Sequence, residues 1–203
     1  SSLLQVGTGG AALMTPPAGA LDIGPGSAEL FTWTYSAVGT GSLTLQGNAN
    51  GTDGASFNAI SSNSSVSNVL TVQSAAVLNI SAIQATPGNV GTGDLVTVTM
   101  QVQNLGETSA LDVSGTSLST FGPASVTVPA SGPLPATVAI LPGGSTATFT
   151  YVYTAFNQIG SLGFSGQALG RDANESKTKT AAVAASAPIT VFAKGKLSVL
   201  SFN

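Results

Sequence analysis

The sequence predicts an all-β fold organised as tandem antiparallel β-sandwiches, of which the first is incomplete. Apolar and polar residues alternate with a period of two along most of the chain, which is the pattern of half-buried strands. Turn residues, above all Gly and Pro, separate the alternating segments at regular intervals. The chain also repeats itself with the period of a whole domain. No segment carries the helical spacing of apolar residues together with helix caps.

The repeat is clearest where two aromatic segments align. Residues 31–37 read FTWTYSA and residues 149–155 read FTYVYTA, so the offset is 118 (149 − 31). One extra residue in the following turn raises the offset to 119, which aligns Asp53 with Asp172 (172 − 53). Because a period of this size is one whole domain, we expect a tandem array in which one unit is complete.

The complete unit is expected at residues 76–193, and its first three strands follow from alternation and turns. Residues 77–84 alternate over a short run. Residues 95–104 place Val and Met on one face and Thr and Gln on the other, as in a half-buried strand. After a turn that contains Gly, the third strand is expected at residues 110–119.

Four more strands complete this unit. The fourth is expected at residues 124–129 together with 136–141, and a proline ends its first part because proline cannot donate to a ladder. Residues 146–155 follow a Pro-Gly-Gly turn and place three aromatic residues on one face. The last two strands are expected at residues 161–169 and 178–192. Seven short strands in roughly 100 residues match an immunoglobulin-like sandwich, although no Cys is present to form its disulfide.

The first unit, residues 1–75, contains only the later strands of this plan. Ser1 aligns with Ser119, so equivalents of residues 77–118 are absent. The remaining strands are expected to expose a row of apolar side chains and unpaired edges, which another segment must cover.

Charge is scarce, at 6% of the chain against a typical value of about a quarter. A polar but nearly uncharged surface is weakly protected against self-association, which fits an assembly, although many extracellular β proteins are simply poor in charge. Residues 1–170 contain acids and no Lys or Arg, so the molecule is a weak dipole suited to head-to-tail docking, or its few charges cluster by chance. No basic patch indicates nucleic-acid binding, and no apolar stretch is long enough to span a membrane.

One strand resembles a known family. Residues 95–106, LVTVTMQVQNLG, are similar to the "VTVTxxVxNxG" strand of CARDB-type and related conserved-repeat domains, which are immunoglobulin-like modules of large bacterial and archaeal surface proteins. Residues 26–35 and 67–72 resemble the closing half of the same module. The resemblance implies extracellular display, adhesion or filament architecture, and it carries no catalytic residues.

The residue types argue against an enzyme. The chain has no His and no Cys, so the usual bases, thiol nucleophiles and zinc ligands are absent, and no catalytic residue, metal site or cofactor is expected. Asp53 and Asp172 hold the same position in successive repeats and follow Gly, so we interpret them as carboxylates that stabilise turns.

Aromatic residues that could bind sugar, and asparagines that could carry glycans, are the two features of the sequence that bear on carbohydrate. The alternation of Trp33, Tyr35, Tyr151 and Tyr153 with Phe predicts core positions, so a sugar-stacking platform would instead use Phe57, Phe121 or Phe156. Glycosylation sequons are widespread in a chain so rich in Ser and Thr, and chance explains several of them. The four candidate glycosylation sites are Asn50, Asn63, Asn79 and Asn174.

The segment 194–203 resembles the first strand of the complete unit, because residues 197–199 align with residues 78–80. It is either the start of a further repeat or a donor strand that pairs with a neighbouring subunit. The candidate coupling residues are Leu197, Val199, Leu200 and Phe202.

Together these features predict a structural subunit, or a repeat segment, of an extracellular surface filament, pilus-like fibre or adhesin stalk. Its partners would be copies of itself in a head-to-tail homopolymer, or neighbouring repeats of the same chain, with glycans as a further possibility. The alternative is a carbohydrate- or surface-binding module on the same scaffold. Either protein would be extracellular or attached to the cell surface.

Overall fold

A computed structural model describes residues 3–126 and 130–195. These residues form strands, turns and loops without any helix, which confirms the all-β prediction. It follows that none of their elements is a helix able to cross a membrane. The chain divides between Ser74 and Ala75 into two compact units, and we call residues 1–74 unit 1 and residues 75–203 unit 2.

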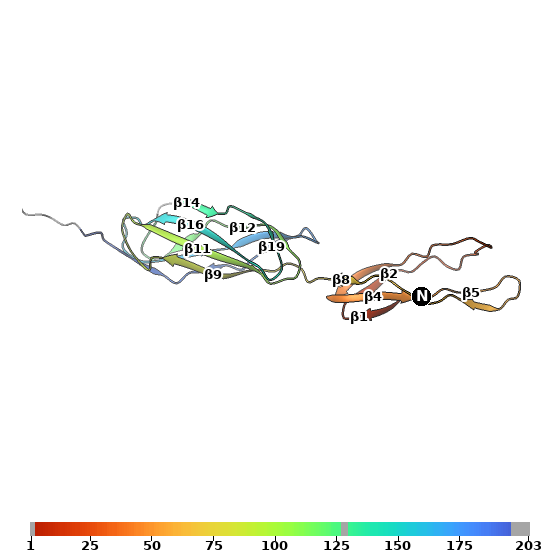
Figure 1. The fold of residues 1–203 in the computed structure, drawn as a ribbon. Helices are drawn as coiled ribbons and strands as arrows, with labels where there is room; N and C mark the ends of the chain where they lie inside the picture. The colour runs from red at the N-terminus through yellow and green to blue at the C-terminus, as the bar shows by residue number, and fades with distance from the viewer. Residues whose placement is uncertain (1–2, 127–129, 196–203) are drawn as a thin grey trace, which may run out of the picture. The chain divides into compact units, whose positions relative to one another are not determined.

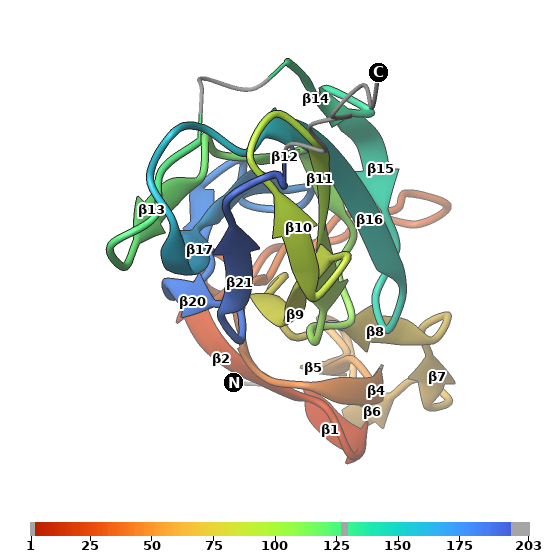
Figure 2. The same ribbon diagram turned by 90° about the vertical axis from the view of Figure 1, so that its left-hand side faces the viewer.

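Unit 2 is built from mostly antiparallel sheets around one core (Figure 1). Its strands are β9 (Leu78–Thr86), β10 (Asn89–Gly91), β11 (Leu95–Asn104), β12 (Ala110–Gly115), β13 (Ser119–Phe121), β14 (Ser131–Leu134), β15 (Val138–Leu141), β16 (Thr146–Thr154), β17 (Gly160–Gly166), β18 (Ala168–Asp172), β19 (Thr178–Thr180), β20 (Ala184–Ala185) and β21 (Ile189–Phe192). The sheet β14-β16-β11-β9 shares its core with the sheets β15-β12-β18-β19 and β10-β21-β17-β13, and β20 pairs with β17. β10 runs parallel to β21 and lies beside it (Figure 2).

Alternation in the sequence decides which side chains enter the core of unit 2. In β11 the alternate Val and Met residues are fully buried, and in β16 the same holds for Phe149, Tyr151 and Tyr153. The ring of Tyr153 packs against that of Phe164 in β17, with centroids 5.0 Å apart. The Tyr151 hydroxyl donates a hydrogen bond of 2.8 Å to the carbonyl of Thr116. Aromatic packing therefore joins the sheets without a disulfide.

Three of the predicted strands are each divided in the structure. The prediction for residues 110–119 covers β12 and the first residue of β13, that for 161–169 covers β17 and the start of β18, and that for 178–192 covers β19, β20 and β21. At one division the Thr116 hydroxyl accepts from the N–H of Gln167 and donates to its carbonyl, both at 3.0 Å. The Thr116 hydroxyl thus takes the place of one backbone acceptor, while the Thr116 N–H still donates to the Gln167 carbonyl at 2.9 Å. Alternation alone does not reveal this exchange.

The first part of the fourth predicted strand, 124–129, is described only as far as Val126, and residues 127–129 lie outside the described residues. Of the described residues 124–126, Val126 alone forms a β-bridge, to Ala155, and β14 begins only at Ser131. Its second part, 136–141, contains β15.

Unit 1 contains shorter strands in three small sheets. They are β1 (Leu4–Gly7), β2 (Gly10–Thr15), β3 (Thr34–Gly39), β4 (Gly41–Gly47), β5 (Asn50–Thr52), β6 (Ala59–Ser61), β7 (Ser65–Val66) and β8 (Leu70–Val72). β4 pairs with β1, β7 and β8, β2 pairs with β3, and β5 pairs with β6, all antiparallel.

The backbone of unit 1 follows the later part of unit 2. With an offset of 119, β4 to β8 fall on the strands β17 to β21. Unusual backbone conformations recur at matching places, which sequence alignment alone cannot establish. The matching positive φ angles are Gly7 138° and Gly122 105°, Gly26 73° and Gly144 75°, Gly41 125° and Gly160 128°, and Phe57 59° and Ser176 57°.

The match corrects the alignment of the first strand. Gly7 corresponds to Gly122, an offset of 115 (122 − 7). The predicted alignment of Ser1 with Ser119 uses an offset of 118 (119 − 1) and is therefore wrong by three residues (118 − 115). The prediction extended the offset of the aromatic segment back across a loop whose length differs between the units. Extending the offset of 115 along the sequence aligns Ser1 with Thr116 (1 + 115).

Candidate interface on unit 1

Unit 1 lacks a closed hydrophobic core. Of its described residues, 3–74, only Leu43 is buried, although many others are apolar. Its counterpart Leu162 lies in the large core of unit 2. Exposed apolar side chains of unit 1 include Leu4, Val6, Met14, Leu21, Ile23, Leu30, Val38, Phe57, Ile60, Val66, Val69 and Leu70.

The aromatic row shows the difference between the units most directly. Phe149, Tyr151 and Tyr153 are at most 1% exposed. Their equivalents Phe31, Trp33 and Tyr35 are only half-buried. The core prediction is thus right for the two tyrosines of unit 2 and wrong for Trp33 and Tyr35. The physical reason is that unit 1 has no equivalent of β11 and β12, which complete the core around this row in unit 2.

β3 and β5 of unit 1 each leave one edge unpaired among the described residues, whereas the equivalent edges of β16 and β18 in unit 2 are paired. β16 pairs with β14 on one side and β11 on the other, whereas β3 pairs only with β2 among the described residues. Likewise β18 lies between β12 and β19, whereas β5 pairs only with β6 in the same ranges. Residues 20–23, equivalent to β15, form no strand, because the partner of β15 is β12. The open edges occur where the equivalents of β11 and β12 are missing.

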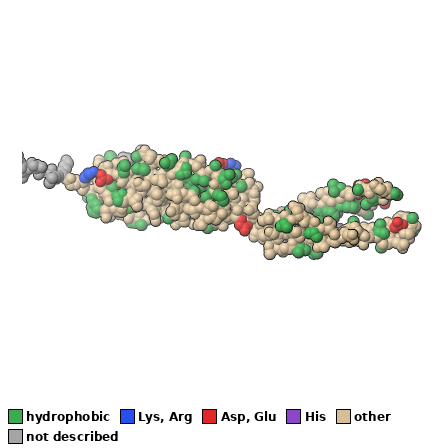
Figure 3. Space-filling model, in the orientation of Figure 1, with side chains coloured by type: hydrophobic (Ala, Val, Ile, Leu, Met, Phe, Trp, Pro, Cys, Tyr) green, Lys and Arg blue, Asp and Glu red, His purple; other side chains and the backbone are tan. Residues whose placement is uncertain are grey.

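A groove of about 1870 Å³ lies within unit 1. Residues 16–24 with Phe31 and Trp33 line one side, and Leu3, Leu4, residues 45–52, Gly54 and residues 60–63 and 65–67 line the rest. The counterparts of both sides contribute to the core of unit 2. Figure 3 shows the hollow between the two arms of unit 1. We call this groove, with the edges of β3 and β5, the open face.

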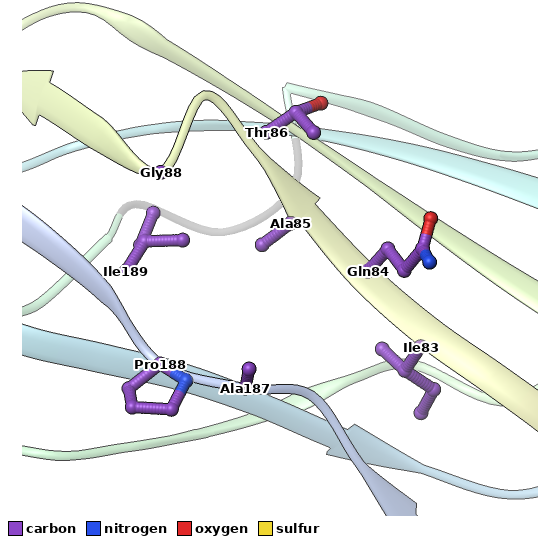
Figure 4. A pocket seen from close by; sticks show the side chains of 8 residues that line it. All are labelled: Ile83, Gln84, Ala85, Thr86, Gly88, Ala187, Pro188 and Ile189. Carbon is purple, nitrogen blue, oxygen red and sulfur yellow. The ribbon is translucent and has the colours of Figure 1, made fainter.

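A much smaller hollow of about 300 Å³ lies in unit 2 between the end of β9 and the segment before β21 (Figure 4). Its lining includes the apolar residues Ile83, Ala85, Ala187, Pro188 and Ile189. The side chains around it include no charged group, so it provides no chemistry beyond apolar contact.

The two aligned carboxylates stabilise turns, as the sequence predicts. Oδ1 of Asp172 accepts hydrogen bonds from the N–H groups of Asn174 and Glu175, both at 2.8 Å. Oδ1 of Asp53 accepts from the N–H groups of Ala55 at 3.1 Å and Ser56 at 2.6 Å.

Asp172 makes one bond that Asp53 lacks. Its Oδ2 accepts a buried hydrogen bond of 2.6 Å from the N–H of Ala76, at the start of unit 2. No described residue of unit 1 donates to Oδ2 of Asp53. The repeat alignment places the missing donor in the segment that unit 1 does not contain.

Hydrogen bonds control the ionisation of both carboxylates. Burial raises the pKa of Asp172, but the N–H groups of Ala76, Glu175 and Asn174 outweigh burial and hold the pKa below its usual value. The N–H and hydroxyl of Ser56, with the N–H of Ala55, lower the pKa of Asp53.

Acid should destabilise unit 2 partly through Asp172. Because its folded pKa lies below its unfolded pKa, Asp172 contributes stability that is present above the unfolded value and is lost as pH falls through the folded value. We expect the free energy of unfolding to fall less steeply below about pH 5 in Asp172→Asn than in the wild type. Urea unfolding at a series of pH values measures both slopes, and equal slopes would contradict the assignment.

Asn104 is a structural side chain that the sequence analysis did not single out. It is fully buried at the end of β11. Its amide donates to the carbonyls of Thr108 at 2.8 Å and Leu141 at 3.1 Å, and its Oδ1 accepts from the N–H groups of Val77 and Gly106, both at 3.1 Å. The available signal was the Asn-x-Gly that follows the valine-rich strand.

The acidic residues form no metal cluster among the residues that the structure describes. Asp94 pairs with Lys194 at 2.5 Å, Glu175 with Lys177 at 3.3 Å, and Asp112 with Arg171. These pairs lie at the surface, where ion pairs contribute little to stability.

The sugar-binding candidates form no aromatic platform among the described residues. Phe57 belongs to unit 1, whereas Phe121 and Phe156 belong to unit 2, and none of the three pairs with another aromatic ring in the described ranges. All three are exposed.

The four sequon asparagines, Asn50, Asn63, Asn79 and Asn174, are also exposed. The amide of Asn174 donates to the Thr108 hydroxyl at 3.2 Å. Glycosylation of these sites stays a prediction. The coupling residues Leu197, Val199, Leu200 and Phe202 lie outside the described residues, so the donor-strand interpretation of that segment stays a prediction too.

No family model and no curated protein matches the chain. Among solved structures, it is similar to one described as "AvmM Catalyzes Macrocyclization in Alchivemycin A Biosynthesis". The match has 14% sequence identity and a TM-score of 0.36, and it covers 62% of this chain and 92% of the other. A likeness of this size carries no argument about function.

Proposed function

We propose that the chain is a structural subunit or repeat segment of an extracellular surface filament, pilus-like fibre or adhesin stalk. Its units are immunoglobulin-like sandwiches, and successive units are coupled end to end. Unit 1 is completed by strands equivalent to β9, β11 and β12, which a neighbouring copy or repeat supplies by β-strand complementation.

The observation that carries this proposal is the contrast between equivalent positions. Phe149 and Tyr151 are fully buried, whereas Phe31 and Trp33, at the same places in the repeat, line a groove. Exposed apolar patches on this scale mark interaction sites. In unit 2 the equivalent surface is covered by β11 and β12, which pair with β16 and β18. The segment that completes unit 1 should therefore consist of alternating aliphatic strands that pair with β3 and β5.

The scarcity of charge supports the same proposal. Only 6% of the residues are charged, so repulsion between neighbouring copies is weak. The residue types and the buried aliphatic strands of unit 2 favour a passive role in assembly over catalysis.

A closed version of unit 1 tests the proposal. We would place a second copy of residues 75–115 directly before Ser1, since Ser1 corresponds to Thr116. We expect the emission of Trp33, the only Trp of the chain, to shift to shorter wavelength, and unit 1 to unfold at higher urea concentration. Burial of large side chains contributes about 1.5–3 kcal/mol each, so the shift in the urea midpoint should be large.

The matched control carries the same added segment with Ser in place of the equivalents of Val98 and Val102. This control has the same length, but two hydroxyl groups interrupt the apolar face of the added strand. We expect its Trp33 emission and urea midpoint to match those of the original chain. Identical Trp33 emission and urea midpoints in all three proteins would overturn the coupling proposal.

A carbohydrate-binding module is the second candidate, because the rings of Phe31 and Trp33 lie 6.4 Å apart beside a groove with Asn48 and Asn50. Saturable binding of oligosaccharides to the original chain, lost when the groove is closed, would favour it over the structural role.

A further inference from the structure

We propose that Asp53 is the docking acceptor of the open face: its free carboxylate oxygen receives a backbone N–H from the first residues of the incoming segment. This inference rests on the proposed function and adds to it the position and the chemistry of the partner. The occupant is a polypeptide segment of the repeat type, with the pattern of residues 74–115.

The hydrogen bonds of the two turns are the first line of support. In both units the N–H at the carboxylate residue donates to the carbonyl five residues later, Asn58 for Asp53 and Lys177 for Asp172, at 2.9 Å. In both, Oδ1 accepts two N–H groups of the turn itself. The two carboxylates are therefore held in the same orientation. In unit 2 that orientation directs Oδ2 to the N–H of Ala76, which lies 96 residues away in sequence.

The glycine before each turn is an independent line of support. A Cβ on Gly170 would lie 3.1 Å from both Leu78 and Val113, so these side chains rest on the glycine in unit 2. A Cβ on the equivalent Gly51 would meet only Ile60, at 3.8 Å. The surface that receives Leu78 and Val113 in unit 2 is therefore present and uncovered in unit 1.

Together the two features describe the partner segment. A backbone N–H meets Asp53, and two residues later a large aliphatic side chain, the equivalent of Leu78, rests on Gly51. The residue that carries the N–H must be small, because Ala76 is buried at this point. A segment shifted by one position presents its aliphatic side chain to the wrong face. A segment without the small residue has no room for its side chain at the place that Ala76 occupies in unit 2. Asp53 and Gly51 thus set the register of the incoming strand.

The test uses a synthetic peptide of residues 74–115 added to the full chain, with binding followed by Trp33 emission. A second peptide carries an N-methyl group on Ala76, which removes the donor and adds a methyl group in its place, so the effect of the methyl group itself must be controlled. A third carries it on Ala75, whose N–H makes no hydrogen bond among the described residues. Each peptide is titrated into the wild-type chain, into Asp53→Asn and into the charge control Glu29→Gln, an exposed acid outside the groove.

We expect N-methylation of Ala76 to weaken binding to the wild-type chain about tenfold to a hundredfold, the usual effect of losing a hydrogen bond to a charged group. Asp53→Asn should weaken binding of the unmodified peptide similarly, because its amide would oppose the N–H. N-methylation should then have little further effect in Asp53→Asn. The peptide methylated at Ala75 should bind the wild-type chain as tightly as the unmodified peptide does. The unmodified peptide should bind Glu29→Gln as tightly as it binds the wild-type chain.

The outcomes separate the two proposals. If no peptide binds saturably, the proposed completion of unit 1 fails. If the peptides bind but neither N-methylation of Ala76 nor Asp53→Asn changes the affinity, completion stands and the role of Asp53 is overturned. Additive losses in the double combination would also overturn it, since they would show that the two groups do not contact each other.

Discussion

Asn104→Ala is expected to lower the free energy of unfolding of unit 2 by at least about 3 kcal/mol, because several buried polar groups lose their partners at once. The amide joins the carbonyls of Thr108 and Leu141 to the N–H groups of Val77 and Gly106, all around the end of β11. Each unsatisfied buried group costs about 1–3 kcal/mol. Urea unfolding followed by far-UV circular dichroism measures the loss.

Asn79→Ala is the matched control, since Asn79 is exposed on β9 of the same unit. Its effect should stay within about 0.5 kcal/mol. A loss below about 1 kcal/mol for Asn104→Ala would mean that water replaces the four bonds, and that Asn104 is not essential to this end of unit 2.

Phe149→Ala is expected to destabilise unit 2 by about 3–5 kcal/mol, the usual cost of removing a buried aromatic ring and leaving a cavity. Phe149 is fully buried between the sheets. The equivalent change in unit 1, Phe31→Ala, removes a half-buried ring and should cost no more than about 1 kcal/mol. Urea unfolding followed by far-UV circular dichroism reports unit 2, and Trp33 fluorescence reports unit 1.

The comparison of the two variants is more informative than either alone. Equal costs would mean that unit 1 already has a closed core around Phe31, and the open face would lose its main support. In the closed version of unit 1, the cost of Phe31→Ala should rise towards that of Phe149→Ala.

The repeat and the strand alternation could be predicted from the sequence because both are local signals. The valine-rich stretch became β11, and the aromatic stretch became β16. The turn role of Asp53 and Asp172 also followed from local chemistry, since a carboxylate after Gly readily accepts N–H groups of its own turn.

The features that the sequence did not reveal depend on contacts between distant residues. Thr116 and Gln167 are 51 residues apart, and the Thr116 hydroxyl bonds to the Gln167 backbone at a point where strands that alternation predicts to be continuous are divided. The bond between Asp172 and Ala76 is equally non-local. The burial of Trp33 and Tyr35 was predicted from alternation, but alternation gives only the face of a strand and not whether a second layer covers it.

The parallel pairing of β10 with β21 governs how unit 2 should respond to mechanical force. The chain enters unit 2 ahead of β9 and leaves the described part after β21, at opposite ends of the unit (Figure 1). A pull on these ends drags β10 and β21 in opposite directions along their common axis. Their hydrogen bonds are then loaded together in shear, instead of being peeled apart one after another. We therefore expect unit 2 to resist a pull on these two ends more strongly than a unit whose terminal strands are peeled apart.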